Sequence, residues 1–329
     1  MVLERERGLR YFPIALFASV MGISGVTLSI TLFENAQKMN HLTSMFFLIL
    51  ASLLFIFNAS IFVYRLIRFK EDVKREFNHP IKMNFFAAIS ISMLLLSIPY
   101  YQINESLSFF VWFIGTILQV YFTLVILSKL IWKSNFQMAQ FNPTWFIPIV
   151  GNLLVPLAGT SHVSADINWI FFSLGILFTI LFMALFFQRV FFYPQIPEKI
   201  TPTFFILLAP PAIGTISYMK LVGNLDVFAY ILYGIAFYLG LLLLFQYKRF
   251  FSIPFSVSWW AYLFPTAAVT NATSYMYMGT GKNYYNWLFY VQLAGLLILT
   301  IYLLWKTIRL AMKHSLCLKE ENSEQVRTA

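Results

Sequence analysis

Charged residues divide the chain into long uncharged stretches. Ten of these contain at least 20 residues without Asp, Glu, Lys or Arg: 11–33, 39–64, 83–104, 106–128, 134–165, 167–188, 200–219, 227–247, 250–281 and 283–305. A helix needs about 20 apolar residues to cross a hydrocarbon layer roughly 30 Å thick. The strands of a membrane barrel would instead alternate over about ten residues. The pattern therefore predicts an all-α integral membrane protein with ten spans.

The composition supports a membrane location. Of the 329 residues, 60% are hydrophobic and 11% are charged, whereas a soluble domain carries roughly a quarter charged residues. The single cysteine, Cys317, rules out an intramolecular disulfide bond and a cysteine metal cluster. The net charge of +10 does not predict nucleic-acid binding, because the basic residues flank the apolar stretches. We therefore expect a lipid bilayer around the chain, and no metal, cofactor or nucleic acid bound to it.

The distribution of Lys and Arg predicts the orientation of the spans. Cytoplasmic loops of membrane proteins carry an excess of these residues. If the N-terminus lies inside, 20 of the 23 Lys and Arg residues fall on the inner side, and the outer loops hold only Lys38, Lys220 and Lys282. The sequence thus predicts a multi-pass membrane protein with both termini in the cytoplasm. Its transmembrane domain, 11–312, lies between two cytoplasmic tails, 1–10 and 313–329.

Proline recurs with the period of one helical hairpin. The first, third, fifth, seventh and ninth spans begin near Pro13, Pro80, Pro143, Pro202 and Pro254, at spacings of 67, 63, 59 and 52 residues. Six more prolines lie further along the same odd spans: Pro99, Pro148, Pro156, Pro210, Pro211 and Pro265. The even spans contain none. We interpret this period as five repeated helical hairpins.

The prolines separate two kinds of helix. A proline inside a helix removes a backbone hydrogen bond and bends the axis, and in lipid the freed carbonyl group must meet protein or water. We therefore expect the odd helices to form an inner ring around a pore and the even helices to face lipid. The odd spans also carry candidates for lining this pore: Gly22, Ser24, Ser90, Ser97, Gly151, Asn152, Gly214, Thr215, Thr266 and Asn271. Close helix packing is the more common role of any one small residue, but five such sets on alternate helices favour a pore.

Several of these segments resemble a known family. Three segments are similar to the tellurite-resistance/dicarboxylate transporter family: YFPIALFASVMGISG, NPTWFIPIVGNLLVP and above all SVSWWAYLFPTAAVTNA. That family includes bacterial TehA-type proteins and the plant guard-cell slow anion channels. The resemblance covers residues 11 to about 312. It implies ten helices arranged as five hairpins around a quasi-fivefold axis, with three such protomers side by side.

The resemblance also implies a gate. The phenylalanine of the WWAYLFP run, which in the family blocks the pore near mid-membrane, corresponds to Phe264. Phe17 on the first span matches a pore-facing position less closely. Ala18 stands where many bacterial members have a glycine, whereas Gly22 keeps a second glycine of that helix. The selectivity of those members is therefore not transferred to this chain.

The residues themselves give a physical reason for a gate at Phe264. It precedes Pro265, whose ring disfavours helical geometry at the preceding residue and frees the carbonyl group of Ala261. We expect a bend here, near the middle of the 250–281 stretch. A phenyl ring at a bend can cross the pore axis and block ions by excluding water.

Two functions remain open. The uncharged stretches hold no carboxylates for proton coupling, the four histidines do not cluster, and no phosphate-binding loop or nucleophile with its base is present. We therefore expect no enzyme. A passive channel for small monovalent anions such as chloride and nitrate suits a neutral pore. The alternative is a secondary transporter or exporter of C4-dicarboxylate, sulfite or tellurite, for which we would expect a fixed cation within the membrane.

Overall fold

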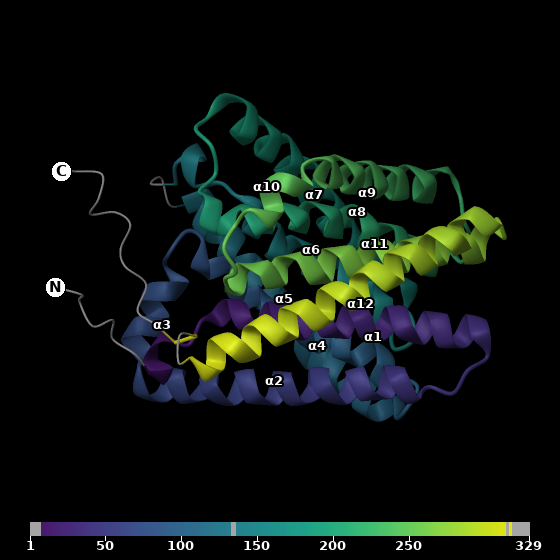
Figure 1. The fold of residues 1–329 in the computed structure, drawn as a ribbon, viewed down its shortest axis with the longest axis horizontal. Helices are drawn as coiled ribbons and strands as arrows, with labels where there is room; N and C mark the ends of the chain where they lie inside the picture. Colours follow the sequence, from purple (N-terminus) through teal and green to yellow (C-terminus); the bar gives the residue numbers. More distant parts are fainter. Residues whose placement is uncertain (1–7, 133–135, 314–315, 318–329) are drawn as a thin grey trace.

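The computed structural model describes residues 8–132, 136–313 and 316–317, and these form helices and connecting turns without a β-strand. Most of the two predicted tails lies outside the described residues. The helices are α1 (Phe17–Gln37), α2 (Leu42–Arg68), α3 (Lys70–Phe77), α4 (Ala87–Tyr100), α5 (Glu105–Trp132), α6 (Ile147–Gly159), α7 (Ala165–Phe192), α8 (Ala209–Val222), α9 (Val227–Phe245), α10 (Tyr247–Phe251), α11 (Leu263–Thr280) and α12 (Asn283–Met312) (Figure 1). The all-α prediction is confirmed.

Eight helical segments in the described part are long and apolar enough to cross a membrane. They correspond to the first four predicted spans and to the sixth, seventh, eighth and tenth. The helix of the fifth span, Pro143–Gly159, is apolar but shorter. The helix of the ninth span, α11, is not among the eight; it is rich in Thr, Asn, Ser and Gly. The chain is thus a multi-pass membrane protein, and the count of ten crossings stays a prediction.

Every helix predicted to bend begins with a 3-10 segment. These segments are Ile14–Leu16 before α1, Lys82–Phe86 before α4, Pro143–Phe146 before α6, Glu198–Leu208 before α8 and Val257–Tyr262 before α11. No such segment precedes α2, α5, α7, α9 or α12, whose preceding turns the structure describes in full. A change from 3-10 to α geometry redirects the backbone without a break in the chain. The repeat read from the prolines is therefore also a repeat of local structure.

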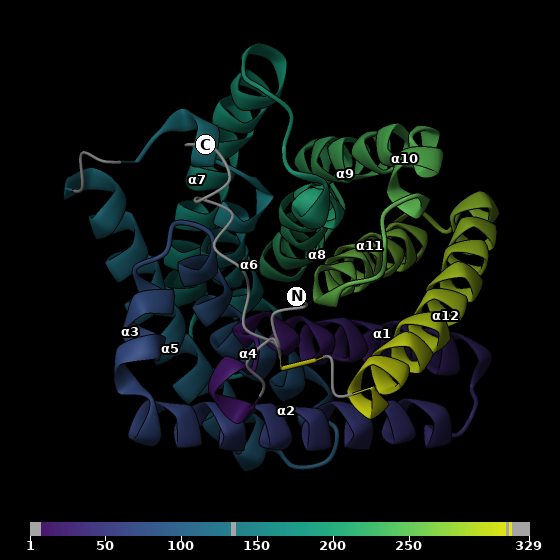
Figure 2. The ribbon, with the colours of Figure 1, turned by 60° about the vertical axis from the view of Figure 1, so that its left-hand side comes forward.

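The helices that begin with 3-10 segments pack against one another. α1 packs against α4 and α11, α4 against α6, α6 against α8, and α8 against α11. Each of them also packs against the long helix that follows it in the chain, as α1 does against α2. Figure 2 shows α2, α7, α9 and α12 at the edges of the molecule, with α6, α8 and α11 between them.

The fraction of buried residues differs between the helices that begin with 3-10 segments and the long helices that follow them. In the most apolar windows of the segments containing α1, α4 and α8, 72–78% of residues are buried, against 17–39% for α2, α5, α7, α9 and α12. The exposed side chains of the second group include many large apolar ones, such as Ile56 on α2 and Ile298 on α12. Apolar side chains on the outside of a helical protein are suited to lipid.

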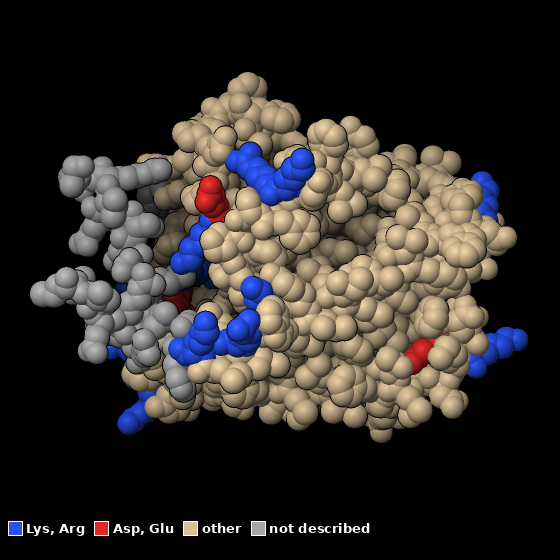
Figure 3. Space-filling view, viewed as in Figure 1, with Lys and Arg blue, Asp and Glu red and all other residues tan. Residues whose placement is uncertain are grey.

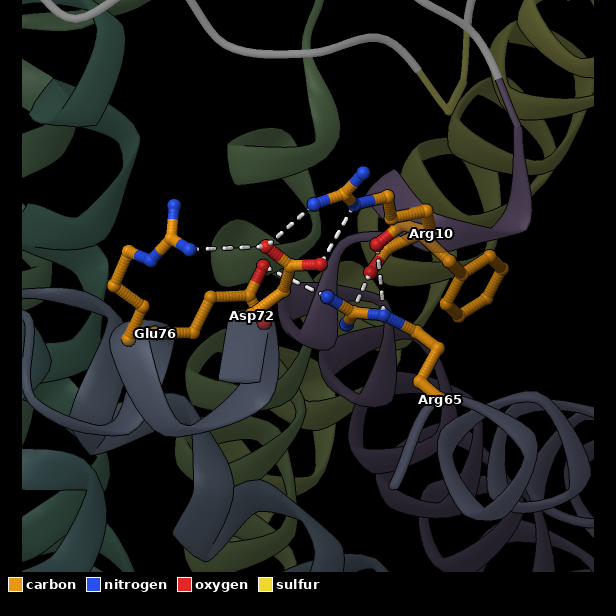
Figure 4. Close-up of polar contacts among 6 residues, drawn as sticks. Arg10, Arg65, Asp72 and Glu76 are labelled. Atoms are coloured by element: carbon orange, nitrogen blue, oxygen red, sulfur yellow. Dashed lines mark hydrogen bonds and ion pairs between the residues drawn. The ribbon is translucent and has the colours of Figure 1, made fainter. Parts of the chain in front are cut away.

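Charged residues gather at one end of the molecule. On the face in Figure 3, Lys and Arg concentrate toward the end at which α3 lies, and the middle is a broad uncharged belt. At this end Arg65, whose side chain is buried, donates hydrogen bonds to the carbonyl oxygens of Arg10 (3.0 Å) and Phe12 (2.7 Å) and to Glu76 (2.9 Å) (Figure 4). Arg10 in turn pairs with Asp72 on α3 at 2.6 Å, and this bond holds the pKa of Asp72 below its usual value. These bonds fasten the segment before α1 to α2 and α3.

Candidate pore and gate

Four of the six predicted kink prolines lie in the first turn of an α-helix. Pro148 stands near the start of α6, Pro210 and Pro211 near the start of α8, and Pro265 is the third residue of α11. The amide groups of a first turn have no partner within the helix, so proline costs little there. The change of direction expected at Phe264 is thus the junction between Val257–Tyr262 and α11, not a break inside a continuous α-helix.

The other two prolines lie within helices. Pro99 is the second-to-last residue of α4, and Pro156 is in the last turn of α6. Both helices end within a few residues of the proline. These two prolines therefore lie at the ends of short inner helices, whereas the other four lie at their beginnings.

The contact between α1 and α11 is close and partly polar. A Cβ added at Gly22 would lie 2.7 Å from Leu263 Cδ2, so only glycine fits there without displacing that side chain. Two turns further along, Ser29 donates a hydrogen bond of 2.6 Å to Asn271 Oδ1, and Asn271 Nδ2 donates to the carbonyl oxygen of Gly25 at 3.3 Å. Small residues let helices in a membrane approach closely, and such hydrogen bonds add to the packing.

Phe264 lies beside this contact. It is 4% exposed, and a Cβ added at Gly25 would lie 3.7 Å from its Cδ2 atom. It makes no ring contact with another aromatic side chain in the described part of the chain. With 100° of rotation per residue, Phe264 lies about 20° from Asn271 and about 60° from Ala267 around α11, so it lies at the edge of the side that meets α1.

Phe17 has different surroundings. Its ring contacts Phe55 and Phe62 of α2 edge-on, with centroids 6.0 and 6.4 Å away, and its side chain is fully buried. The first residue of α1 thus packs against a neighbouring outer helix. A role for Phe17 in gating stays a prediction, but its contacts are those of a packing residue.

Four of the predicted pore-lining residues face outer helices. Ser90 donates to Gln119 Oε1 on α5 at 2.7 Å, and Asn152 Nδ2 donates to Thr123 Oγ1, also on α5, at 3.0 Å. An added Cβ at Gly151 would clash with the Gln119 side chain, and one at Gly214 would meet Leu232 of α9 and Ile176 of α7. These small and polar residues are used in packing between helices.

The remaining candidates lie elsewhere. Ser97, Thr215 and Thr266 donate to carbonyl oxygens of their own helices. Gly22 and Asn271 belong to the contact between α1 and α11. The hydroxyl group of Ser24 is buried and has no hydrogen-bond partner among the described residues. For all ten candidates, lining of a pore stays a prediction.

Gln119, which the sequence pattern did not single out, joins three helices. Its Nε2 donates to the Pro148 carbonyl oxygen of α6 at 2.7 Å and to Thr123 at 3.0 Å, while its Oε1 accepts from Ser90 of α4. The side chain is fully buried. An amide within an apolar stretch was the available signal, because a buried polar group in a membrane needs partners.

Comparisons with known proteins place this multi-pass helical protein in a family. The family model for SLAC1, described as a voltage-dependent anion channel, matches residues 11–308. The chain therefore belongs to the SLAC1 family, whose members are anion channels and transporters, and the resemblance drawn from the sequence is confirmed.

Relatives come from plants, bacteria and archaea. The chain is 32% identical over 275 residues to the S-type anion channel SLAH2 of Arabidopsis thaliana, covering 80% of this chain and 52% of that protein. It is 26% identical over 300 residues to a tellurite resistance protein TehA homolog of Haemophilus influenzae, covering 89% and 91%. An uncharacterized transporter of Methanocaldococcus jannaschii is 23% identical over 295 residues, with 82% and 86% covered. The chain spans about half the length of the plant channels it matches.

Proposed function

We propose that the protein is a passive anion channel for small monovalent anions of the chloride and nitrate class. Its pore runs between α1, α4, α6, α8 and α11, which form the inner ring of ten crossings arranged as five hairpins. The observation that carries the proposal is the closed series of contacts among these five helices, with Phe264 beside the contact that completes it.

The polar groups of the inner helices support a neutral pore. The hydroxyl groups of Thr215, Thr266 and Thr270 donate to carbonyl oxygens one turn earlier in their own helices. Neutral dipoles lower the cost of bringing an anion into the membrane without holding it so tightly that conduction stops. The names of the plant relatives, S-type anion channels, agree with this substrate class.

The gate is the ring of Phe264. A buried phenyl ring excludes water from a narrow pore, and an ion cannot shed its water there without a large cost. Gly25 of α1 lies against the ring without a side chain of its own, and Phe264 has no aromatic partner in the described part of the chain. Opening therefore needs a side-chain rotation or a small movement between α1 and α11.

The second candidate is a secondary transporter or exporter of C4-dicarboxylate, sulfite or tellurite. The names of two relatives, a tellurite resistance protein and an uncharacterized transporter, favour it. A carrier changes conformation in each cycle, so its flux saturates and produces no unitary current. The channel predicts discrete current steps instead.

Assembly and location complete the proposal. From the family resemblance we infer a homotrimer in a bacterial inner membrane. Both termini are placed in the cytoplasm because basic residues concentrate near α3, while apolar side chains cover the outer helices. A probe that cannot cross the membrane should then reach a cysteine at Gly281 from outside and one at Lys74 only from the cytoplasm. Labelling of both from one side would contradict the ten-crossing topology.

Currents across a planar bilayer test the function. The purified protein is reconstituted, and chloride on one side is replaced in turn by nitrate, sulfite and malate. Discrete current steps whose reversal potential shifts with chloride and nitrate are expected. Saturable, proton-dependent uptake into vesicles with no current steps would support the carrier instead.

A further inference from the structure

Lys220 lies within an inner helix. The sequence placed it in an outer loop, but the structure places it in the last turn of α8, two residues before the helix ends at Val222. It is partly buried, at the end of the bundle where Gly279 of α11 approaches Met219 and Leu225. It therefore puts a cation in the last turn of one of the five helices of the proposed inner ring, at the mouth of the proposed pore and not in its neutral middle.

The ammonium group of Lys220 has one partner in the described part of the chain. Its Nζ donates to the carbonyl oxygen of Leu157 in the last turn of α6, and no carboxylate pairs with it there. An ammonium group has three N–H donors and no acceptor. A charge withdrawn from water is costly without a counterion, so this group has both the charge and the free donors to hold an anion.

The carboxylates of Asp226 and Glu34 are held by other groups. Asp226 accepts from Tyr218 Oη at 2.6 Å and from the amide groups at the start of α9. Glu34 accepts from the amide groups of Thr43 and Ser44 at the start of α2. Both acidic groups therefore stabilise the first turns of outer helices, and neither neutralises Lys220.

Lys220 also faces away from the outer helices. On α8, Gly214 faces α7 and α9, whereas Ser217 donates to the Leu153 carbonyl oxygen of α6. At 100° per residue, Lys220 lies about 60° from Ser217 and about 120° from Gly214 around the axis. It therefore lies on the side that α8 turns toward α6 and the interior of the bundle.

We propose that Lys220 is an anion-binding residue at the outer mouth of the pore, which concentrates anions before they reach Phe264. The proposal rests on the proposed function and adds a charged site to it. A fixed cation at the mouth of a cleft raises the local concentration of anions, and the effect falls with ionic strength. Small inorganic anions such as chloride and nitrate are the ligands, since a single ammonium group distinguishes little beyond charge and size.

Lys220 also has a structural use. Leu157 lies in the last turn of α6, where a lysine stabilises the exposed carbonyl groups. Glutamine can still donate a hydrogen bond to this carbonyl group but carries no charge. Lys220→Gln therefore separates the two roles, and Lys220→Arg keeps the charge.

The experiment compares unitary currents at low and high salt. In the Phe264→Ala background, Lys220→Gln should reduce inward access of anions and lower the conductance several-fold in about 20 mM salt, with the difference largely lost near 1 M. Lys220→Arg should keep most of the conductance. Lys282→Gln is the matched control, because Lys282 is an exposed lysine of the same end and lies before α12. Equal conductance of Lys220→Gln and its background at low salt would overturn the proposal.

A second measurement does not depend on conduction. Nitrate in place of gluconate at constant ionic strength should raise the unfolding temperature of the detergent-solubilised parent, and this gain should disappear in Lys220→Gln. A variant that unfolds earlier but keeps the full nitrate effect would show a structural role only and overturn the proposal. If no variant conducts but nitrate stabilisation requires Lys220, the channel function fails while the anion site stands.

Discussion

Gly25 and Phe264 face each other between α1 and α11, with the Phe264 Cδ2 atom 3.7 Å from the position that a Cβ on Gly25 would occupy. The same Cβ would lie 2.9 Å from Cβ of Ala267, an atom fixed to the backbone of α11. The two helices would have to move apart to admit it. The glycine thus sets how closely α1 approaches the helix that carries Phe264.

Gly25→Ala should therefore destabilise the protein. Overpacking costs about 1–3 kcal/mol, and we expect a lower unfolding temperature in detergent. Gly234→Ala on α9 is the matched control, because an added Cβ there meets nothing within 4 Å and alanine favours a helix. An unfolding temperature for Gly25→Ala equal to that of Gly234→Ala would contradict the close contact.

Gln119→Leu should also destabilise the protein, because it leaves the Pro148 carbonyl oxygen and the Ser90 hydroxyl without this partner. Hydrogen bonds between membrane helices contribute about 0.6 kcal/mol on average and up to about 1.7. We expect a loss of about 1 kcal/mol or more in the free energy of unfolding.

Gln292→Leu on α12 provides the comparison. The Oε1 atom of Gln292 is buried and has no hydrogen-bond partner among the described residues. Replacing it with leucine should leave the stability unchanged or increase it. The hydrogen-bond account of Gln119 is refuted if both variants behave alike.

Arg65→Lys tests the network that fastens the segment before α1. Lysine keeps the charge but lacks the planar group that donates at once to Arg10, Phe12 and Glu76. We expect a lower unfolding temperature than in Arg68→Lys, since Arg68 is exposed on the same helix. Equal stability of the two variants would show that the bonds of Arg65 contribute little.

His162 should make stability depend on pH. It lies outside the helices, 2.9 Å from Ser108 Oγ, and burial lowers its pKa below the ordinary value of 6.5, opposed by Glu105. The folded state then binds the proton more weakly than the unfolded state. The contribution of neutral His162 to the free energy of unfolding is therefore present above pH 6.5 and decreases as the pH falls below that value.

His162→Gln should reduce this pH dependence. Between pH 7.5 and 5.5 the unfolding temperature of the parent should fall more steeply than that of the variant. Thermal unfolding in matched buffers measures both slopes. Identical slopes would mean that another group is responsible.

The positions of the helices could be predicted from charge spacing alone. All but the first three residues of the stretch 39–64 lie within α2, and the stretch 106–128 lies within α5, because placing a charge in lipid is costly enough to exclude it. The proline period likewise identified the five helices that begin with 3-10 segments. The local geometry differed from the predicted bends inside the helices. Four of the six prolines lie in a first turn, where no amide donor is needed.

The direction of the side chains could not be predicted in this way. Gly151 and Ser90 have the residue types of a pore lining, yet both contact Gln119, because close packing between helices uses the same types. Lys220 appeared to belong to a loop, since the charge count ended the seventh span one residue before it. Whether a small or charged side chain lines a pore or packs between helices depends on which neighbouring helix it faces.

The most direct test of the account is the unitary conductance of Phe264→Ala in a planar bilayer. Removing the ring should open the pore and raise chloride conductance strongly over the parent, while membrane expression stays normal. Phe251→Ala, at an exposed phenylalanine of α10, should conduct like the parent. A Phe264→Ala protein that is folded and inserted but conducts no better than the parent would contradict the gate.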